Sequence, residues 1–68
     1  MNLSEKLKCC RVDSHLTQAQ VADKLHVSRK TISGWENGHS FPDTTSLVLL
    51  SDIYQVTVDD LLRDDRLL

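Results

Sequence analysis

Residues 27–38, VSRKTISGWENG, carry the side chains whose types and spacing are best suited to chemistry. Read as a helix, this segment has only Ile32 and Trp35 to turn inward. Its other face would carry two cations, two small polar side chains and a glycine: Arg29, Lys30, Ser33, Asn37 and Gly34. Such a face can hydrogen-bond to base edges in the major groove of DNA, and a glycine there lets the groove wall approach closely. A solvated helix surface has the same composition, so both interpretations stay open for this segment alone.

The other reactive side chains do not form a recognisable catalytic or metal-binding pattern. His15, His26 and His39 fall at three separate turns, and no Ser/His/Asp or glycine-loop arrangement accompanies them. Cys9 and Cys10 are adjacent, which disfavours a disulfide between them, and they lack the CxxC spacing of a zinc or redox site. We therefore expect no enzyme, no metal and no cofactor, and two reduced thiols in a cytoplasmic protein.

Charge is distributed unevenly along the 68 residues. The net charge of −2 by itself disfavours a nucleic-acid partner. However, residues 1–42 hold six Lys or Arg against four Asp or Glu, a net of +2, whereas residues 43–68 hold two against six, a net of −4. A partner that reads charge would distinguish the two parts. The chain contains neither an apolar run of about 18 residues nor a signal-peptide pattern, so we expect no membrane-spanning segment.

Five helix-start signals divide the chain. Each is a short oxygen-bearing side chain followed three residues later by a second polar residue: Asn2/Glu5, Thr17/Gln20, Ser28/Thr31, Asp43/Ser46 and Thr57/Asp60. The first two pairs fit a capping box well, and the other three are looser. Apolar residues at helical spacing follow every start, and no segment alternates like a strand. We therefore predict one all-α domain over residues 1–68, with inward residues Leu3, Leu7, Cys10, Val21, Ala22, Leu25, Ile32, Trp35, Leu47, Leu50, Ile53, Tyr54, Val58, Leu61 and Leu62.

Residues 17–37 predict a helix-turn-helix. One helix runs from about Thr17 to Leu25, the three residues HVS form a turn, and the polar helix follows directly. Ala22 is small where the two helices would cross, and Val27 and Ile32 would fill the angle between them.

The segment TQAQVADKLHVSRKTISGWENG resembles the helix-turn-helix of the phage-repressor and Cro-like (XRE) transcription regulators. The matching elements are Thr17–Gln18, Ala22, Val27–Ser28, Ile32, Trp35 and Glu36–Asn37–Gly38. The likeness continues through FPDTTSLVLLSDIYQVTVDDLL and covers nearly the whole chain. It implies a compact five-helix lambda-repressor-like DNA-binding domain, with the helix-turn-helix in helices 2 and 3 and helix 3 in the major groove.

The resemblance implies a role for each residue of a DNA-binding set. Arg29 and Lys30 would reach base edges, and Arg29 is suited to a bidentate bond with guanine. Ser28 would contact the DNA backbone or a thymine methyl group, and Gln18 would either bind a phosphate or support a base-reading side chain. Asn37 and backbone N–H groups of the following loop would bind phosphates and so set the register. The full candidate set is Gln18, Ser28, Arg29, Lys30, Ser33, Gly34, Asn37 and His39.

This sequence also matches and departs from the family at structural positions. Family members form a salt bridge between the first helix and the end of the third, which is matched here by Arg11 and Glu36. His15 and His26 occupy turn positions where the family usually has Gly, so a left-handed backbone there would be strained. Gly34 replaces a long base-reading side chain, and His39 replaces a common Lys or Arg. We therefore expect modest DNA affinity per monomer.

The sequence as a whole predicts a sequence-specific DNA-binding transcriptional regulator, and more specifically a repressor, whose partner is double-stranded DNA. Modest affinity per monomer favours a homodimer on two half-sites about 34 Å apart. The acidic C-terminal part would face away from DNA, and its candidates for a dimer surface are Leu61, Leu62, Leu67 and Leu68. The alternative for these leucines is ordinary core packing, which suits the first pair better than the last. The alternative is a protein-interaction module, such as an antitoxin or co-regulator. Salt separates the two functions, because DNA binding weakens steeply as salt is added.

Overall fold

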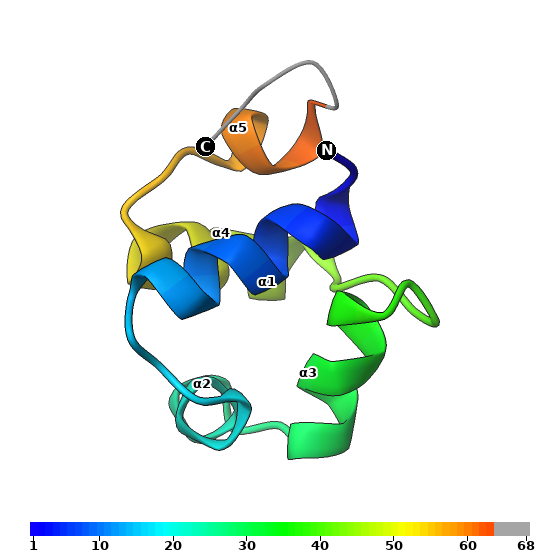
Figure 1. Cartoon of the computed structure of the whole chain (residues 1–68), viewed down its shortest axis with the longest axis vertical. Helices are drawn as coiled ribbons and strands as arrows, with labels where there is room; N and C mark the ends of the chain where they lie inside the picture. The colour runs from blue at the N-terminus through cyan, green and yellow to red at the C-terminus, as the bar shows by residue number, and fades with distance from the viewer. Residues whose placement is uncertain (64–68) are drawn as a thin grey trace.

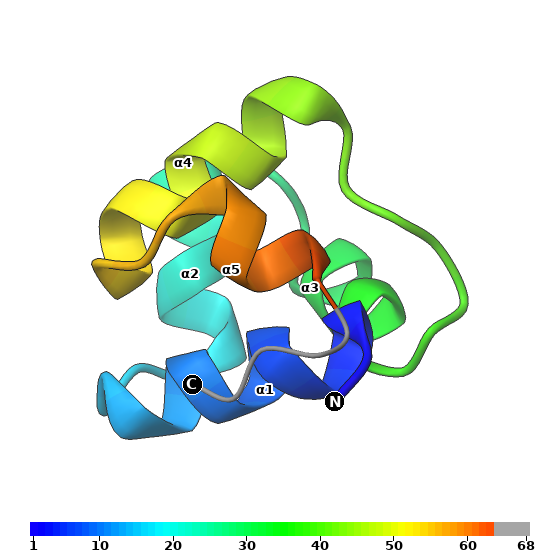
Figure 2. The ribbon, with the colours of Figure 1, turned by 90° about the horizontal axis from the view of Figure 1, so that it is seen from above.

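The computed structural model describes residues 1–63 and contains five helices and no strand in that range. They are α1 (Leu3–Asp13), α2 (Gln18–Leu25), α3 (Arg29–Glu36), α4 (Thr44–Tyr54) and α5 (Val58–Leu62). Figure 1 shows α2 and α3 at the lower end of the molecule and α5 at the upper end, with α1 and α4 between them, and Figure 2, seen from above, shows α1 and α4 on opposite sides of α5. The predicted all-α, five-helix fold is confirmed.

Side-chain caps fix where the helices begin. All five predicted N-cap residues occupy that position, and each accepts a hydrogen bond from the backbone N–H three residues later. This bond satisfies one of the donors that a helix start leaves without a partner. Full capping boxes open α1 and α2, as predicted, and also α5, where Thr57 and Asp60 were expected to form only a loose pair. Local sequence therefore sets the helix boundaries.

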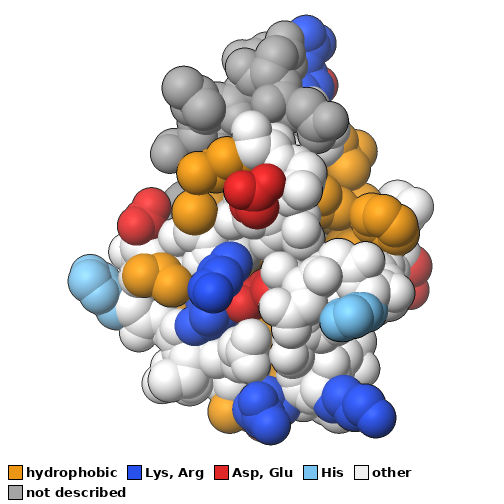
Figure 3. All heavy atoms as spheres, turned by 45° about the vertical axis from the view of Figure 1, so that its right-hand side comes forward, with side chains coloured by type: hydrophobic (Ala, Val, Ile, Leu, Met, Phe, Trp, Pro, Cys, Tyr) orange, Lys and Arg blue, Asp and Glu red, His pale blue; other side chains and the backbone are white. Residues whose placement is uncertain are grey.

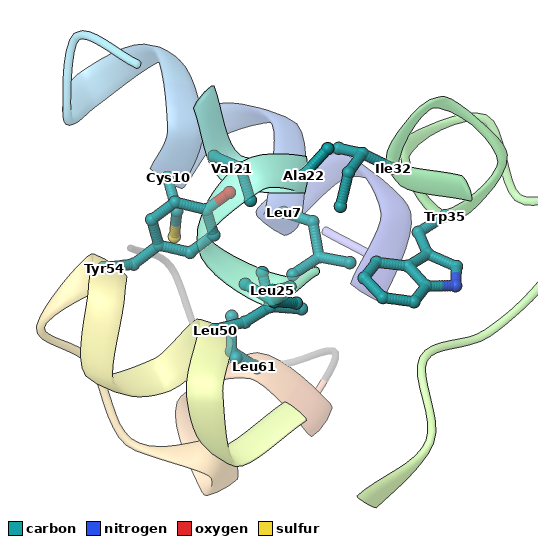
Figure 4. Packing of buried hydrophobic residues seen from close by; sticks show 10 residues of the cluster. All are labelled: Leu7, Cys10, Val21, Ala22, Leu25, Ile32, Trp35, Leu50, Tyr54 and Leu61. Atoms are coloured by element: carbon teal, nitrogen blue, oxygen red, sulfur yellow. The ribbon is translucent and has the colours of Figure 1, made fainter. Parts of the chain in front are cut away.

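One apolar core joins the five helices. Ile32 and Trp35 point inward from α3 and are 2% and 7% exposed. Figure 4 shows them facing side chains from the other four helices, with Leu61 of α5 closing the far side of the cluster. Two calls from the sequence need correction. Leu61 is completely buried, so it cannot form a dimer surface, whereas Leu62 is 52% exposed and is not a core residue. A five-residue helix buries one narrow side, so two adjacent leucines cannot both face the core.

Lys6 is buried inside this fold, which the sequence pattern did not predict. Its side chain is fully buried, and its Nζ donates to the backbone carbonyl oxygens of Asp60, at 2.8 Å, and Arg63. These carbonyls belong to the C-terminal turn of α5, where the helix dipole favours a cation. Lys6 thus connects α1 to the end of α5 through a charged hydrogen-bond donor rather than through apolar packing.

Three residues other than glycine have a left-handed backbone just after a helix. His15, His26 and Gln55 have φ angles of 59°, 57° and 58°. The resemblance placed the two histidines at turn positions where glycine is usual, and their left-handed backbone is confirmed. Gln55 was not singled out, although it ends α4 as His26 ends α2. Each such residue carries a steric cost that glycine avoids.

Replacing His26 with glycine is therefore expected to stabilise the fold by up to about 1 kcal/mol, because the αL penalty is removed and partly offset by glycine's larger chain entropy. Urea unfolding followed by Trp35 fluorescence measures the change. His39→Gly is the matched control, since His39 is also exposed but has no positive φ. If both substitutions lower stability equally, the left-handed backbone at His26 carries no cost.

Candidate nucleic-acid interface

The α2–turn–α3 unit is built by a three-residue connection. His26 ends α2 in the left-handed conformation, and the Val27 N–H donates to the Ala22 carbonyl at 3.0 Å, which closes the turn. Ala22 is 4% exposed and Val27 packs against the core, as predicted for the crossing of the two helices. Ser28 then caps α3. The turn therefore fixes the direction in which α3 leaves the body of the protein.

The outward face of α3 is polar and accessible. Arg29, Lys30 and Asn37 are exposed, and Ser33 and Gly34 are half-buried. Figure 3 shows Lys and Arg side chains at the lower edge of the molecule, where α2 and α3 lie, and further cations together with acidic side chains higher on the same face. Ile32 and Trp35 occupy the core, whereas the cations at the start of α3 lie at the surface. The sequence-predicted orientation of this helix is confirmed.

Both serines of the candidate set also form hydrogen bonds within the protein. Ser28 Oγ accepts from the Thr31 N–H at 3.1 Å and lies 3.0 Å from Thr31 Oγ1. Ser33 Oγ accepts from Asn37 Nδ2 at 3.1 Å, across one turn of helix. A hydroxyl group has one donor and two acceptor positions, so both serines keep capacity for a further contact.

Gly34 lies close to the segment that follows α3, which the sequence did not reveal. A Cβ atom added at Gly34 would lie 3.1 Å from Ser40 Oγ, and the His39 N–H donates to the Gly34 carbonyl at 2.9 Å. The segment between α3 and α4 therefore packs closely along the end of α3. Pro42 is buried and holds the far end of this segment, while Phe41 is 77% exposed. His39 is exposed in this segment.

A hydrogen-bonded chain runs from the protein interior to the exposed start of α3. Arg11 and Glu36, the pair that the resemblance implies, form a salt bridge with Nε–Oε2 at 2.8 Å and Nη2–Oε1 at 3.1 Å. Gln18 Nε2 donates to Glu36 Oε1 at 3.1 Å, and Gln18 Oε1 accepts from Arg29 Nη1 at 3.3 Å. Gln18 is thus placed between a buried carboxylate and an exposed guanidinium.

Arg11 in this hydrogen-bonded chain and Tyr54 near it both have raised pKa values. The Arg11 guanidinium is held in its charged form, since its hydrogen bond to Glu36 raises the pKa of Arg11. Burial raises the pKa of Tyr54, and the negative charge of Glu36 raises it further. The tyrosine is therefore neutral, and the arginine is charged, throughout the physiological pH range.

Within residues 1–63, no group of three His, Cys, Asp or Glu side chains is placed to hold a metal ion. Cys9 and Cys10 are free thiols, and burial raises the pKa of Cys10. No helix in the same range is long and apolar enough to cross a membrane.

Known proteins are similar to this chain in sequence and in fold. The sequence model of the helix-turn-helix family matches residues 7–61. Over 68 residues the chain is 43% identical to the HTH-type transcriptional activator BcrR of Enterococcus faecalis, covering 100% of this chain and 33% of BcrR. Over 66 residues it is 36% identical to the HTH-type transcriptional regulator ImmR of Bacillus subtilis, covering 97% of this chain and 52% of ImmR.

The crystal structure of the P22 c2 repressor in complex with a synthetic operator has the same fold. It superposes with a TM-score of 0.88 at 29% sequence identity, covering 96% of this chain and 98% of the repressor chain. The chain spans about a third of BcrR and about half of ImmR, so it corresponds to only part of each curated relative.

Proposed function

Because this chain belongs to the helix-turn-helix family of phage-repressor-like (XRE) transcriptional regulators, we propose that it binds double-stranded DNA with α3 in the major groove and regulates transcription from an operator. The observation that carries this proposal is the orientation of α3. Ile32 and Trp35 anchor the helix in the core, so Arg29 and Lys30 remain exposed at its N-terminal end. In helix-turn-helix proteins, the N-terminal residues of the recognition helix contact base edges.

The candidate residues divide into two roles. Arg29 and Lys30 at the start of α3 contact base edges, and Ser33 and Gly34 lie against the groove wall on the same face. Ser28, Asn37 and His39 border that face and contact the DNA backbone, which sets the register without reading sequence. The exposure of the other five residues supports these roles. Ser33 and Gly34 are half-buried and therefore less accessible.

Repression is the proposed outcome of operator binding. A solved structure of the same fold is a repressor in complex with a synthetic operator. BcrR is an activator, however, so the fold serves both directions of control. Reporter expression with and without the protein, from a promoter that carries the bound site, decides the direction. A fall in expression supports repression, and a rise identifies an activator.

The salt dependence of DNA binding tests the proposed function. The slope of log affinity against log salt concentration is expected to be about −0.9 for each phosphate neutralised, so several contacts give a steep dependence. Fluorescence anisotropy of a labelled duplex measures this slope. Binding that does not change with salt, or binding of a protein but of no duplex, would instead support the protein-interaction alternative.

We also propose that the chain binds its operator as a homodimer. Modest affinity per monomer favours two copies on half-sites about 34 Å apart. Of the residues first considered for the dimer surface, Leu62 is exposed in α5, and Leu67 and Leu68 lie outside the described residues. An exposed leucine on the side away from α3 leaves the DNA-reading face free.

Leu62→Glu is expected to weaken dimer formation and to lower operator affinity by at least about tenfold, since a charge would be placed in an apolar contact. Sedimentation velocity measures the dimer, and Val12→Glu is the matched control because Val12 is also exposed, on α1. If Leu62→Glu and the parent chain dimerise equally, α5 is not the dimer surface.

A further inference from the structure

We infer that Glu36 is a positioning residue for DNA recognition, because it fixes the orientation of the Gln18 amide and through it the direction of Arg29. This inference rests on the proposed function, in which Arg29 reads a base. It assigns to a buried residue of the ion pair an effect on sequence preference, in addition to its part in holding α1 against α3.

The buried carboxylate determines which end of the Gln18 amide faces it. Glu36 is 7% exposed, and its side chain is 2% exposed, so its oxygens depend on protein donors. Oε2 accepts from Arg11, while Oε1 accepts from both Arg11 and Gln18. An ionised carboxylate can only accept hydrogen bonds. Gln18 must therefore direct its NH₂ group toward Glu36, and its amide oxygen is turned the opposite way.

The amide oxygen then supplies an acceptor for the guanidinium at the surface. Arg29 Nη1 donates to Gln18 Oε1 at 3.3 Å, a long contact that leaves the other guanidinium donors available. Arg29 is the first residue of α3 and is exposed, so few other contacts restrict its long side chain. If the amide were reversed, its NH₂ group would face Arg29, and two donors would oppose each other. The orientation of Gln18 thus decides whether Arg29 is held or released.

Glu36→Gln separates this role from simple packing, since it keeps the size of the side chain but allows either end of the amide at position 36 to face Gln18. The matched control is Glu5→Gln, because Glu5 is also a glutamate that accepts a hydrogen bond, in the exposed cap of α1. Because Glu36→Gln also weakens the ion pair, Gln18→Met serves as a second variant. It leaves Arg11 and Glu36 unchanged and removes the amide.

The experiment measures the affinity of each folded variant for a panel of duplexes that differ at single base pairs of a selected half-site. Glu36→Gln and Gln18→Met are expected to reduce discrimination about two- to tenfold at the base pair identified by Arg29→Ala, the range given by one hydrogen bond. Neither should reduce it further when combined with Arg29→Ala. A uniform loss at every base pair, or a loss fully additive with Arg29→Ala, would overturn the inference and leave Glu36 as a structural residue.

A second measurement needs no DNA and therefore distinguishes failure of this inference from failure of the proposed function. In ¹⁵N-labelled protein, one Gln18 side-chain NH₂ proton is expected to be shifted downfield and protected from exchange, and to lose both features in Glu36→Gln. Glu5→Gln should leave this resonance unchanged. A Gln18 amide that resembles a solvated glutamine in the parent chain would overturn the inference, whether or not the protein binds DNA.

Discussion

Replacing Arg11 with alanine is expected to lower the free energy of unfolding by about 3–5 kcal/mol, the usual cost of removing one partner from a buried ion pair. The Glu36 side chain is 2% exposed, so the substitution would leave a carboxylate in the interior without its cation. The hydrogen bond from Arg11 Nη1 to the Leu16 carbonyl, at 3.0 Å, would also be lost. Since the free energy of unfolding of a native protein is only about 5–15 kcal/mol, this variant should be close to unfolding.

Urea unfolding followed by fluorescence of Trp35, the single tryptophan, measures this loss. Lys8→Ala is the matched control, because Lys8 is an exposed cation of the same helix and its removal should change stability by less than about 0.5 kcal/mol. An Arg11→Met/Glu36→Leu double variant should be more stable than Arg11→Ala, since no unpaired charge remains. A loss below about 1 kcal/mol for Arg11→Ala would show that the pair behaves like a surface ion pair.

Arg29→Ala is expected to cost about 1–3 kcal/mol of binding free energy at the preferred operator and to relax sequence preference at one base pair. The reason is that a bidentate contact to a base edge carries sequence information, whereas a phosphate contact does not. Arg29 is exposed and its side chain donates a hydrogen bond to Gln18, so its removal should leave the fold intact. Affinities for duplexes substituted at each position measure both effects.

Asn37→Ala and Lys8→Ala are the controls for this result. Asn37 is proposed to contact the DNA backbone, so its loss should weaken binding by a similar factor for all sequences. Lys8 lies in α1, outside the helix-turn-helix, and its loss should change affinity little beyond the small effect of net charge. If Arg29→Ala binds all duplexes as the parent does, Arg29 does not read a base.

Much of the fold could be predicted because its determinants are local. The N-caps at Asn2, Thr17 and Thr57 act within one turn of helix, so the sequence places the helix starts directly. Ile32 and Trp35 are three residues apart, which puts them on one side of any helix and turns the polar side outward. Both kinds of signal need only a few consecutive residues.

Features that depend on contacts between distant segments could not be predicted in the same way. The burial of Lys6 had no signal in the sequence, because lysine is seldom buried and its partners at Asp60 and Arg63 lie more than 50 residues away in sequence. The close approach of Ser40 to Gly34 depends on the path of a loop. Leu62 was misplaced because helical spacing alone does not say how wide a buried side a five-residue helix has.

The candidate site shows the same division. The pattern of cations and small side chains on α3 identified Arg29, Lys30 and Ser33 as one face, since these residues share a helix. The resemblance left two roles open for Gln18. The contact of Gln18 with Glu36 joins the start of α2 to the end of α3 and could be seen only once the helices were placed in space. Helix periodicity carries no information about such contacts.

Selection of duplexes from a random DNA pool by the whole chain tests most directly whether the outward face of α3 reads sequence. We predict enrichment of an inverted repeat whose half-site centres lie about 34 Å apart, one turn of B-DNA. The same selection with Arg29→Ala should lose the preference at one position of each half-site. Recovery of a pool indistinguishable from the starting one, by a chain shown to be folded, would contradict DNA recognition by this helix.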